Sequence, residues 1–242
     1  MKKIVGVILM LLVILPAVSQ VKSKIQTRTG YKNQLEIYGR VAYHGLLYFP
    51  TGKDSLLVQN DAKMDSVVIS PVLTIDNKPY TVAGFKDNAF EYDVDLKYIS
   101  IPTSITEITS SCFYGCSRLR ECEMPSVETI DSYAFCRTGL THIEFPQHLK
   151  YIGAFAFREC DELRYVEFPA KMQSIGKSAF ASCHIDTIKV NSITPFELIG
   201  PVFETRSSQF KQPYTVLSVP KGSKELYEQS DGWRRFKIIV EH

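Results

Sequence analysis

Five phenylalanines recur at nearly constant spacing along the middle of the chain. They are 23, 22, 22 and 23 residues apart, and an alanine or a cysteine precedes each of them: Phe90, Phe113, Phe135, Phe157 and Phe180. A unit of about 22 residues is too short to enclose a core of its own, so its apolar side chains must pack against the next copy. The repeat therefore predicts stacked coils.

Each unit carries two further apolar patterns. The first reads L-x-x-I-x-(I/F)-P, as in residues 96–102, and its period of two is typical of a strand that ends at the proline. The second reads I-x-x-I and leads into the turn before the next phenylalanine. Stacked strands would form a single parallel sheet with neighbours about 4.8 Å apart. A period of 22 residues lies in the range of leucine-rich repeats, so we expect a β-rich α/β leucine-rich-repeat solenoid over residues 65–191.

The units resemble the BspA-type leucine-rich repeat of bacterial surface proteins. The resemblance is carried by residues 104–125, SITEITSSCFYGCSRLRECEMP, and by residues 171–190, KMQSIGKSAFASCHIDTIKV. Residues 41–48 and 217–241 look like the usual end pieces of such proteins. The resemblance implies a secreted or surface interaction protein. Some members of the family are adhesins for host matrix proteins, and many have no known ligand.

We expect both ends of the solenoid to be capped, because a terminal coil would otherwise expose its core. Residues 35–60 alternate between polar and apolar and suggest short antiparallel strands, within an N-terminal β cap over residues 20–64. Residues 192–242 suggest an irregular capping coil with a short helix over 224–229, which Gly222 and Ser223 can cap. We expect Trp233 to pack in this cap rather than to serve as a ligand platform.

Residues 1–19 have the pattern of a signal peptide. Lys2 and Lys3 precede an apolar run over residues 4–14, and Ala17 and Ser19 are the small residues of a cleavage site before Gln20. The run is shorter than the roughly 20 residues needed to cross a bilayer, so a membrane anchor is the weaker interpretation. The sequence predicts export to the cell surface or the extracellular space, with the periplasm as an alternative and no transmembrane span in the mature chain.

The charge balance argues against nucleic acid as a partner. The chain has 28 lysines and arginines and 26 aspartates and glutamates. Loss of Lys2 and Lys3 with the signal peptide would leave 26 of each sign. A mature chain without net charge has no dominant basic surface for a nucleic acid or an anionic membrane.

The six cysteines read as small core residues. Cys116, Cys160 and Cys183 share one column, three residues after a phenylalanine, where other units have Thr138 and Asp93. Cys160 and Cys183 are expected on adjacent coils, where their Cα atoms could lie within the range of a disulfide bond, but the mixed column favours free thiols.

No pattern in the sequence predicts catalysis or a cofactor. There is no C-x-x-C pair, and the five histidines share no ligand spacing with the cysteines, so we expect no metal site. Nucleophile-elbow, zinc-protease, P-loop and dinucleotide-binding motifs are also missing from the sequence. We therefore expect a protein that is not an enzyme.

The outward positions of the predicted strands form two columns on the open face of the sheet. The first column is Tyr98, Glu121, His142, Tyr165 and Thr187, and the second is Ser100, Glu123, Glu144, Glu167 and Lys189, which Ser218 would continue. Three glutamates in register about 5 Å apart would repel one another unless water or a basic partner compensates their charge.

We expect this open face to bind a protein ligand, and the resemblance suggests a host extracellular-matrix or cell-surface protein. A plain solvated face without a ligand is the alternative at the level of the residues. At the level of function, the alternatives are a structural or self-assembling envelope protein and a periplasmic scaffold or inhibitor.

Overall fold

The structure is a computed structural model that describes residues 40–204 and 214–242. All of these residues lie in one compact unit, Gln34–His242. Strands dominate it, and the described residues form one α-helix, α3 (Lys224–Gln229), and one short 3₁₀ helix, η1 (Trp233–Arg235). The predicted signal peptide, residues 1–19, falls outside the described residues.

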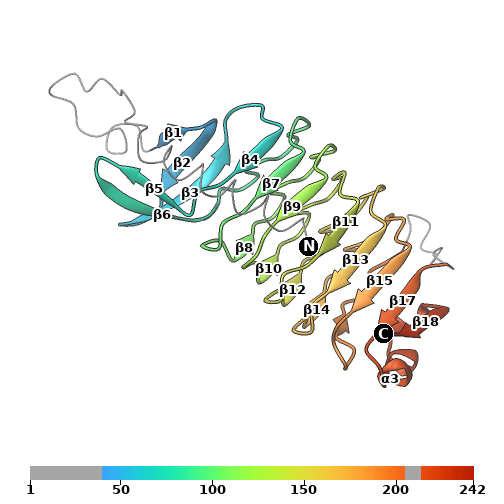
Figure 1. The fold of residues 1–242 in the computed structure, drawn as a ribbon. Helices are drawn as coiled ribbons and strands as arrows, with labels where there is room; N and C mark the ends of the chain where they lie inside the picture. The colour runs from blue at the N-terminus through green and yellow to red at the C-terminus, as the bar shows by residue number, and fades with distance from the viewer. Residues whose placement is uncertain (1–39, 205–213) are drawn as a thin grey trace, which may run out of the picture. The chain divides into compact units, whose positions relative to one another are not determined.

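A five-stranded sheet precedes the repeats (Figure 1). Its spatial order is β1 (Val41–Tyr43), β2 (Leu46–Pro50), β3 (Ser55–Asn60), β6 (Lys78–Phe85) and β5 (Val72–Ile75). The antiparallel strands expected here are present, because β1 pairs with β2 and β2 pairs with β3. The alternating side chains of β2 and β3 bury Leu46, Tyr48, Leu56 and Val58.

This sheet interleaves with the repeats along the chain. Strand β4 (Ser66–Val68) already pairs with the first repeat strand, whereas the later strands β5 and β6 belong to the preceding sheet. The boundary at residue 64 therefore stays a prediction.

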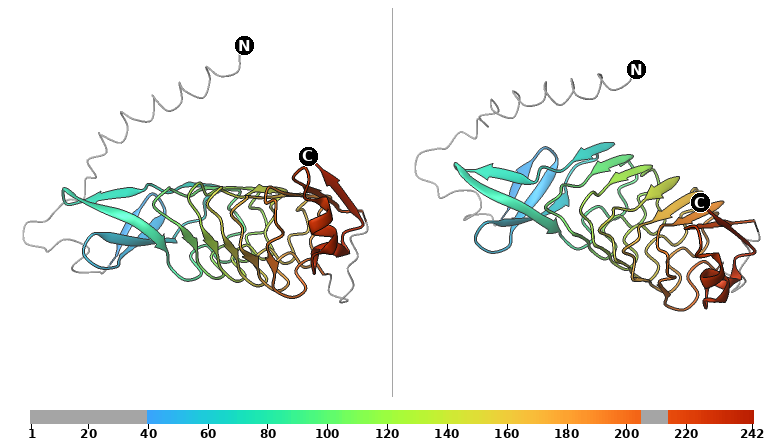
Figure 2. Two further views of the ribbon diagram at one scale, coloured as in Figure 1. Left: turned by 90° about the horizontal axis from the view of Figure 1, so that it is seen from below. Right: turned by 60° about the horizontal axis from the view of Figure 1, so that its bottom comes forward.

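The repeats form the expected solenoid, in which strands of successive coils lie side by side in parallel (Figures 1 and 2). We call the sheet of longer strands the main sheet. It consists of β4, β7 (Tyr98–Ser100) and β9 (Glu121–Glu123), followed by β11 (His142–Glu144), β13 (Tyr165–Phe168), β15 (Thr187–Val190), β17 (Val216–Val219) and β18 (Ile238–Glu241).

A second parallel sheet, the minor sheet, arises from the I-x-x-I segments. Its strands are two residues long: β8 (Glu107–Ile108), β10 (Thr129–Ile130), β12 (Tyr151–Ile152), β14 (Ser174–Ile175) and β16 (Glu197–Leu198). The sequence predicted a single sheet, and the structure has this second one in addition. It forms because the last isoleucine of each segment pairs in register with that of the next coil.

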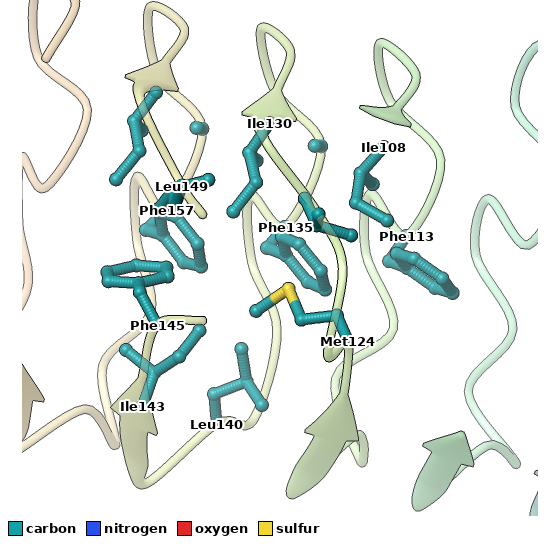
Figure 3. Close-up of a cluster of buried hydrophobic side chains, with 14 of the residues drawn as sticks. Ile108, Phe113, Met124, Ile130, Phe135, Leu140, Ile143, Phe145, Leu149 and Phe157 are labelled. Atoms are coloured by element: carbon teal, nitrogen blue, oxygen red, sulfur yellow. The ribbon is translucent and has the colours of Figure 1, made fainter. Parts of the chain in front are cut away.

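The repeated phenylalanines stack through the core. Successive ring centroids from Phe90 to Phe180 lie 5.0–5.3 Å apart, and Phe203 extends the stack by a further 5.6 Å. Figure 3 shows Phe113, Phe135 and Phe157 of this row, each beside an aliphatic side chain of its own coil. The separation follows from the spacing of parallel strands, so each buried ring adds to one continuous apolar column.

The main sheet is interrupted between β9 and β11, which the sequence analysis did not anticipate. Leu140 follows Phe135 by five residues where Leu119 follows Phe113 by six, and Val127 comes two residues after its proline rather than three. Ile185 also follows its phenylalanine after five residues, yet β15 pairs normally with β13. Both shortenings lie in the chain between β9 and β11, one after the end of β9 and the other before the start of β11. We attribute the break to this combination.

The C-terminal helix has the bounds that were predicted, but its cap differs. Ser223 occupies the N-cap position, and its hydroxyl donates to Pro220 O at 2.6 Å instead of capping the helix. Glu241 Oε1 accepts hydrogen bonds from the backbone of Gly222 and Lys224 at 2.8 and 3.2 Å. Ser223 thus occupies the predicted cap position, but its side chain does not cap the helix, because the Glu241 carboxylate from β18 accepts the backbone N–H groups of this turn.

Trp233 packs in the cap, as expected. Its side chain is fully buried, its indole Nε1 donates to Phe196 O at 3.0 Å, and its ring lies edge-on to Phe196 and Tyr227. A ring enclosed in this way offers no platform to a ligand.

All six cysteines are free thiols in the structure. In the shared column, each thiol donates to the carbonyl of the phenylalanine one coil earlier, at 3.0–3.1 Å: Cys116 to Phe90, Cys160 to Phe135 and Cys183 to Phe157. Burial raises the pKa of the Cys183 thiol well above its usual value. Each thiol of the column therefore satisfies a buried backbone carbonyl group.

Candidate partner-binding face

The structure places the predicted columns on the outward side of the main sheet, which we call the open face. Tyr98 pairs with Glu121 and Ser100 with Glu123, while beyond the break His142, Tyr165 and Thr187 are in register. Glu144, Glu167, Lys189 and Ser218 form the corresponding second row. The alternation of strand side chains explains why each of these residues points away from the core.

The predicted row of three stacked glutamates is only partly formed. Glu144 and Glu167 are direct neighbours, but Glu123 lies across the break and has no ladder partner in β11. The expectation of three carboxylates in register is wrong for Glu123, because β9 and β11 do not form a ladder with each other.

Glu167 is compensated by its own surroundings. Its carboxylate accepts hydrogen bonds from Tyr165 Oη at 2.6 Å, Asn191 Nδ2 at 2.8 Å and Lys189 Nζ at 2.9 Å. Partial burial alone would raise its pKa, but the hydrogen bonds from Tyr165, Asn191 and Lys189 hold the pKa at about 2. Glu167 therefore stays ionised and paired, and it offers little charge to a ligand.

A related arrangement holds Glu123 on the other side of the break. Ser100 Oγ donates to Glu123 Oε2 at 3.0 Å. Partial burial, followed by the neighbouring Glu123 carboxylate, raises the pKa of Tyr98. Glu123 itself is exposed, so its charge still faces solvent.

The uncompensated charge lies between these two networks. Glu121 and Glu144 are both exposed, and neither has an ion-pair partner among residues 40–204 and 214–242. His142 lies between them in the chain, exposed, with its Nδ1 3.2 Å from Thr141 Oγ1. Together with Glu123, these side chains make an acidic patch on both sides of the break: Glu121, Glu123 and Glu144.

Three residues of the open face were missed by the sequence analysis. Val216 continues the first row, and β18 adds Ile238 and Val240 opposite Val216 and Ser218. The apolar pair of β17 with its closing proline was recognisable, but β18 has neither the proline nor the phenylalanine of a unit. Only the folded chain returns it to the edge of the main sheet.

The described part of the chain contains no cluster of three or more histidines, cysteines, aspartates or glutamates that could hold a metal ion. Asp93, which alternates with Glu91 and Asp95 in the sequence, instead accepts hydrogen bonds from Asn60 and from the backbone of Leu96. Within the same described residues, no helix is long and apolar enough to cross a membrane.

Stacked coils, parallel sheets and a continuous phenylalanine column define a leucine-rich-repeat solenoid. Residues 84–201 match the BspA type leucine rich repeat region in six copies. The repeat region of this chain belongs to that family, as the resemblance of its units suggested. Proteins of this class are generally non-enzymatic and typically bind other proteins.

Several solved structures share the fold. The pneumococcal vaccine antigen PcpA superposes with a TM-score of 0.58 at 20% identity, over 76% of this chain and 51% of that chain. A T. pallidum leucine rich repeat protein gives 0.56 at 28% identity, over 62% and 70%. A leucine rich cell surface protein from Faecalibacterium prausnitzii gives 0.53 at 17% identity, over 74% and 54%.

This chain thus spans about half the length of the pneumococcal antigen that it matches. No curated protein matches its sequence.

Proposed function

We propose that this chain is an exported, non-enzymatic binding module. Its open face would bind a basic segment of a protein ligand. The acidic patch of Glu121, Glu123 and Glu144 is the observation that carries the proposal. These carboxylates lie on a rigid sheet, so a ligand would meet charges whose positions are already fixed by the fold.

The surroundings of the patch favour a charged protein partner. Tyr98 and Tyr165 flank it half-buried, the Tyr165 hydroxyl donates to Glu167, and tyrosine is enriched in protein interfaces. Glu167 and Lys189 neutralise each other at the far side, so attraction for lysine or arginine is concentrated near the break. We infer that ligand specificity comes from this half of the face.

Export and surface location belong to the same proposal. The pattern of residues 1–19 supports a signal peptide, and a cell surface protein from Faecalibacterium prausnitzii shares the fold. The division into a cap over 20–64, repeats over 65–191 and a capping coil over 192–242 is likewise proposed. Adhesion to a host matrix or cell-surface protein is the ligand class that we would test first.

The test is a binding titration of the purified chain against a panel of matrix and serum proteins. A Glu121→Lys/Glu144→Lys variant reverses two exposed charges and keeps Tyr165, Glu167, Lys189 and Asn191 themselves unchanged. We expect the variant to bind at least about tenfold more weakly, with most of the change in the association rate and in the salt dependence.

Glu162→Lys is the matched control, because Glu162 is exposed on a turn outside the open face. It should bind like the wild type. Equal loss in the control, or full binding by the double variant, would move the site away from the acidic patch.

A further inference from the structure

The last strand of the main sheet leaves one backbone edge open. The backbone N–H of His242 donates to Val219 O at 3.0 Å, so even-numbered residues of β18 direct their backbone groups toward β17. Backbone groups of successive strand residues point to opposite sides, so Ile239 and Glu241 of β18 direct theirs outward. No backbone group of the described residues bonds to that outer edge.

The side chains of this strand are unusual for an unpaired edge. Ile238 and Val240 point to the open face and are 38% and 41% exposed. Natural edge strands commonly carry charges, prolines or bulges that prevent pairing, whereas an exposed apolar edge is a template for another strand.

The strand is also complementary to itself. Lys237 and Glu241 stand at equal distances on either side of Ile239 and carry opposite charges. Glu241 is held in place because its Oε1 accepts from the backbone of Gly222 and Lys224. Lys237 is exposed and has no ion-pair partner in the described part of the chain.

We propose that β18 pairs antiparallel with β18 of a second copy of this chain, about a two-fold axis at Ile239. In an antiparallel ladder, residues that direct their backbone groups at each other form the hydrogen-bonded pairs. That rule limits the ladder to registers in which odd-numbered residues oppose each other. Among these, the opposite charges of Lys237 and Glu241 favour the register in which Ile239 opposes Ile239 and Lys237 opposes Glu241. The same register sets Ile238 opposite Val240, so apolar side chains meet on the open face and opposite charges meet on the other side.

A two-fold interface of this kind is closed and uses one patch twice, which is the commonest symmetry of protein oligomers. It joins two main sheets into one, with both open faces on the same side. The pairing itself does not depend on the proposed ligand. If the acidic patch binds as proposed, however, the dimer presents two patches together and increases avidity for a multivalent surface.

Sedimentation equilibrium of the full chain tests the association. A four-residue strand pair is a small interface, so we expect a monomer–dimer equilibrium with a Kd of about 10–100 µM. Val240→Lys should weaken it at least about tenfold, because a lysine would replace an apolar contact at the pair. Ile199→Lys, at a position that is 49% exposed and outside β18, should dimerise like the wild type. Unchanged circular dichroism and melting would show that both variants fold.

Disulfide trapping tests the register. Directly opposed residues of a non-hydrogen-bonded pair have Cα atoms about 4.5 Å apart, within the range of disulfide bonds. A mixture of Ile238→Cys and Val240→Cys chains should form a covalent heterodimer under mild oxidation, and each variant alone and the wild type should not.

Four results would overturn the proposal. The chain could remain monomeric at about 1 mM, or Val240→Lys could dimerise as strongly as the wild type. Growth of the assembly beyond a dimer with concentration, or equal cross-linking of single variants, would show a different contact.

Discussion

Single polar residues are held on the open face by networks that cross from coil to coil. Glu167 accepts hydrogen bonds from a residue of its own strand, Tyr165, and from Lys189 and Asn191 in the next coil. A sheet residue of this kind has two roles, since it links neighbouring coils and removes a charge from the surface. The acidic character of the face is therefore narrower than the count of glutamates suggests.

The Glu167 network makes stability depend on acid pH. The pKa of Glu167 is lowered from 4.5 to about 2, so its contribution is present above pH 4.5 and is lost as the pH falls toward 2. We expect Glu167→Gln to lose about 1–2 kcal/mol at pH 7, allowing for solvent screening. Urea denaturation between pH 2 and 7 should show the difference from the wild type shrinking toward pH 2. A constant difference would contradict this account.

At the scale of the element, the break between β9 and β11 depends on close backbone approach. Gly139 lies where unit three is one residue shorter than unit two, and a Cβ atom placed on it would be 2.4 Å from Ser117 O. Arg120 Nη1 donates to Gly139 O at 2.7 Å across the same junction. No strand ladder joins the two coils at this junction. The Arg120 side chain links them, and the missing side chain of Gly139 allows their backbones to approach.

Gly139→Ala should therefore destabilise the fold by about 2–3 kcal/mol, because the added methyl group would push against backbone rather than a movable side chain. Chemical denaturation followed by circular dichroism measures this. Gly84→Ala is the matched control, since its Cβ would meet only the end of Leu57 at 3.1 Å, and it should cost less than about 1 kcal/mol. Similar costs for the two variants would show that the junction is able to relax.

The whole molecule is a stack in which each coil covers the next, so the last coil depends on its cap. Trp233 contacts Phe196, Phe203, Tyr227 and Phe236 and closes the phenylalanine column at this end. In a linear array, loss of the terminal cover is felt through neighbouring interfaces rather than at one site alone.

Trp233→Ala should lower the free energy of unfolding by about 3–5 kcal/mol, through the cavity and through exposure of the last coil. The readout is urea denaturation followed by far-ultraviolet circular dichroism, because the variant lacks the only tryptophan. Arg234→Ala, in the same 3₁₀ helix but exposed, should stay within about 0.5 kcal/mol of the wild type. A small effect at Trp233 would mean that the cap adds little to the stack.

The sequence by itself determined the repeat, its strands and its core. Columns such as Phe135, Ile143 and Ile152 recur at fixed spacing, and stacking is the only way for short units to bury them. The helix over 224–229 and the burial of Trp233 also followed from local pattern and residue type.

Only the tertiary structure decided which of these repeats stay in register and which charges remain free. The break beside Gly139, the compensation of Glu167 by Asn191 and the cap of α3 by Glu241 all join segments of different coils or distant parts of the chain. Column patterns report which way a side chain points within one coil. They do not report how far neighbouring coils are displaced, and that displacement sets the contacts of the open face and of the outer edge of β18.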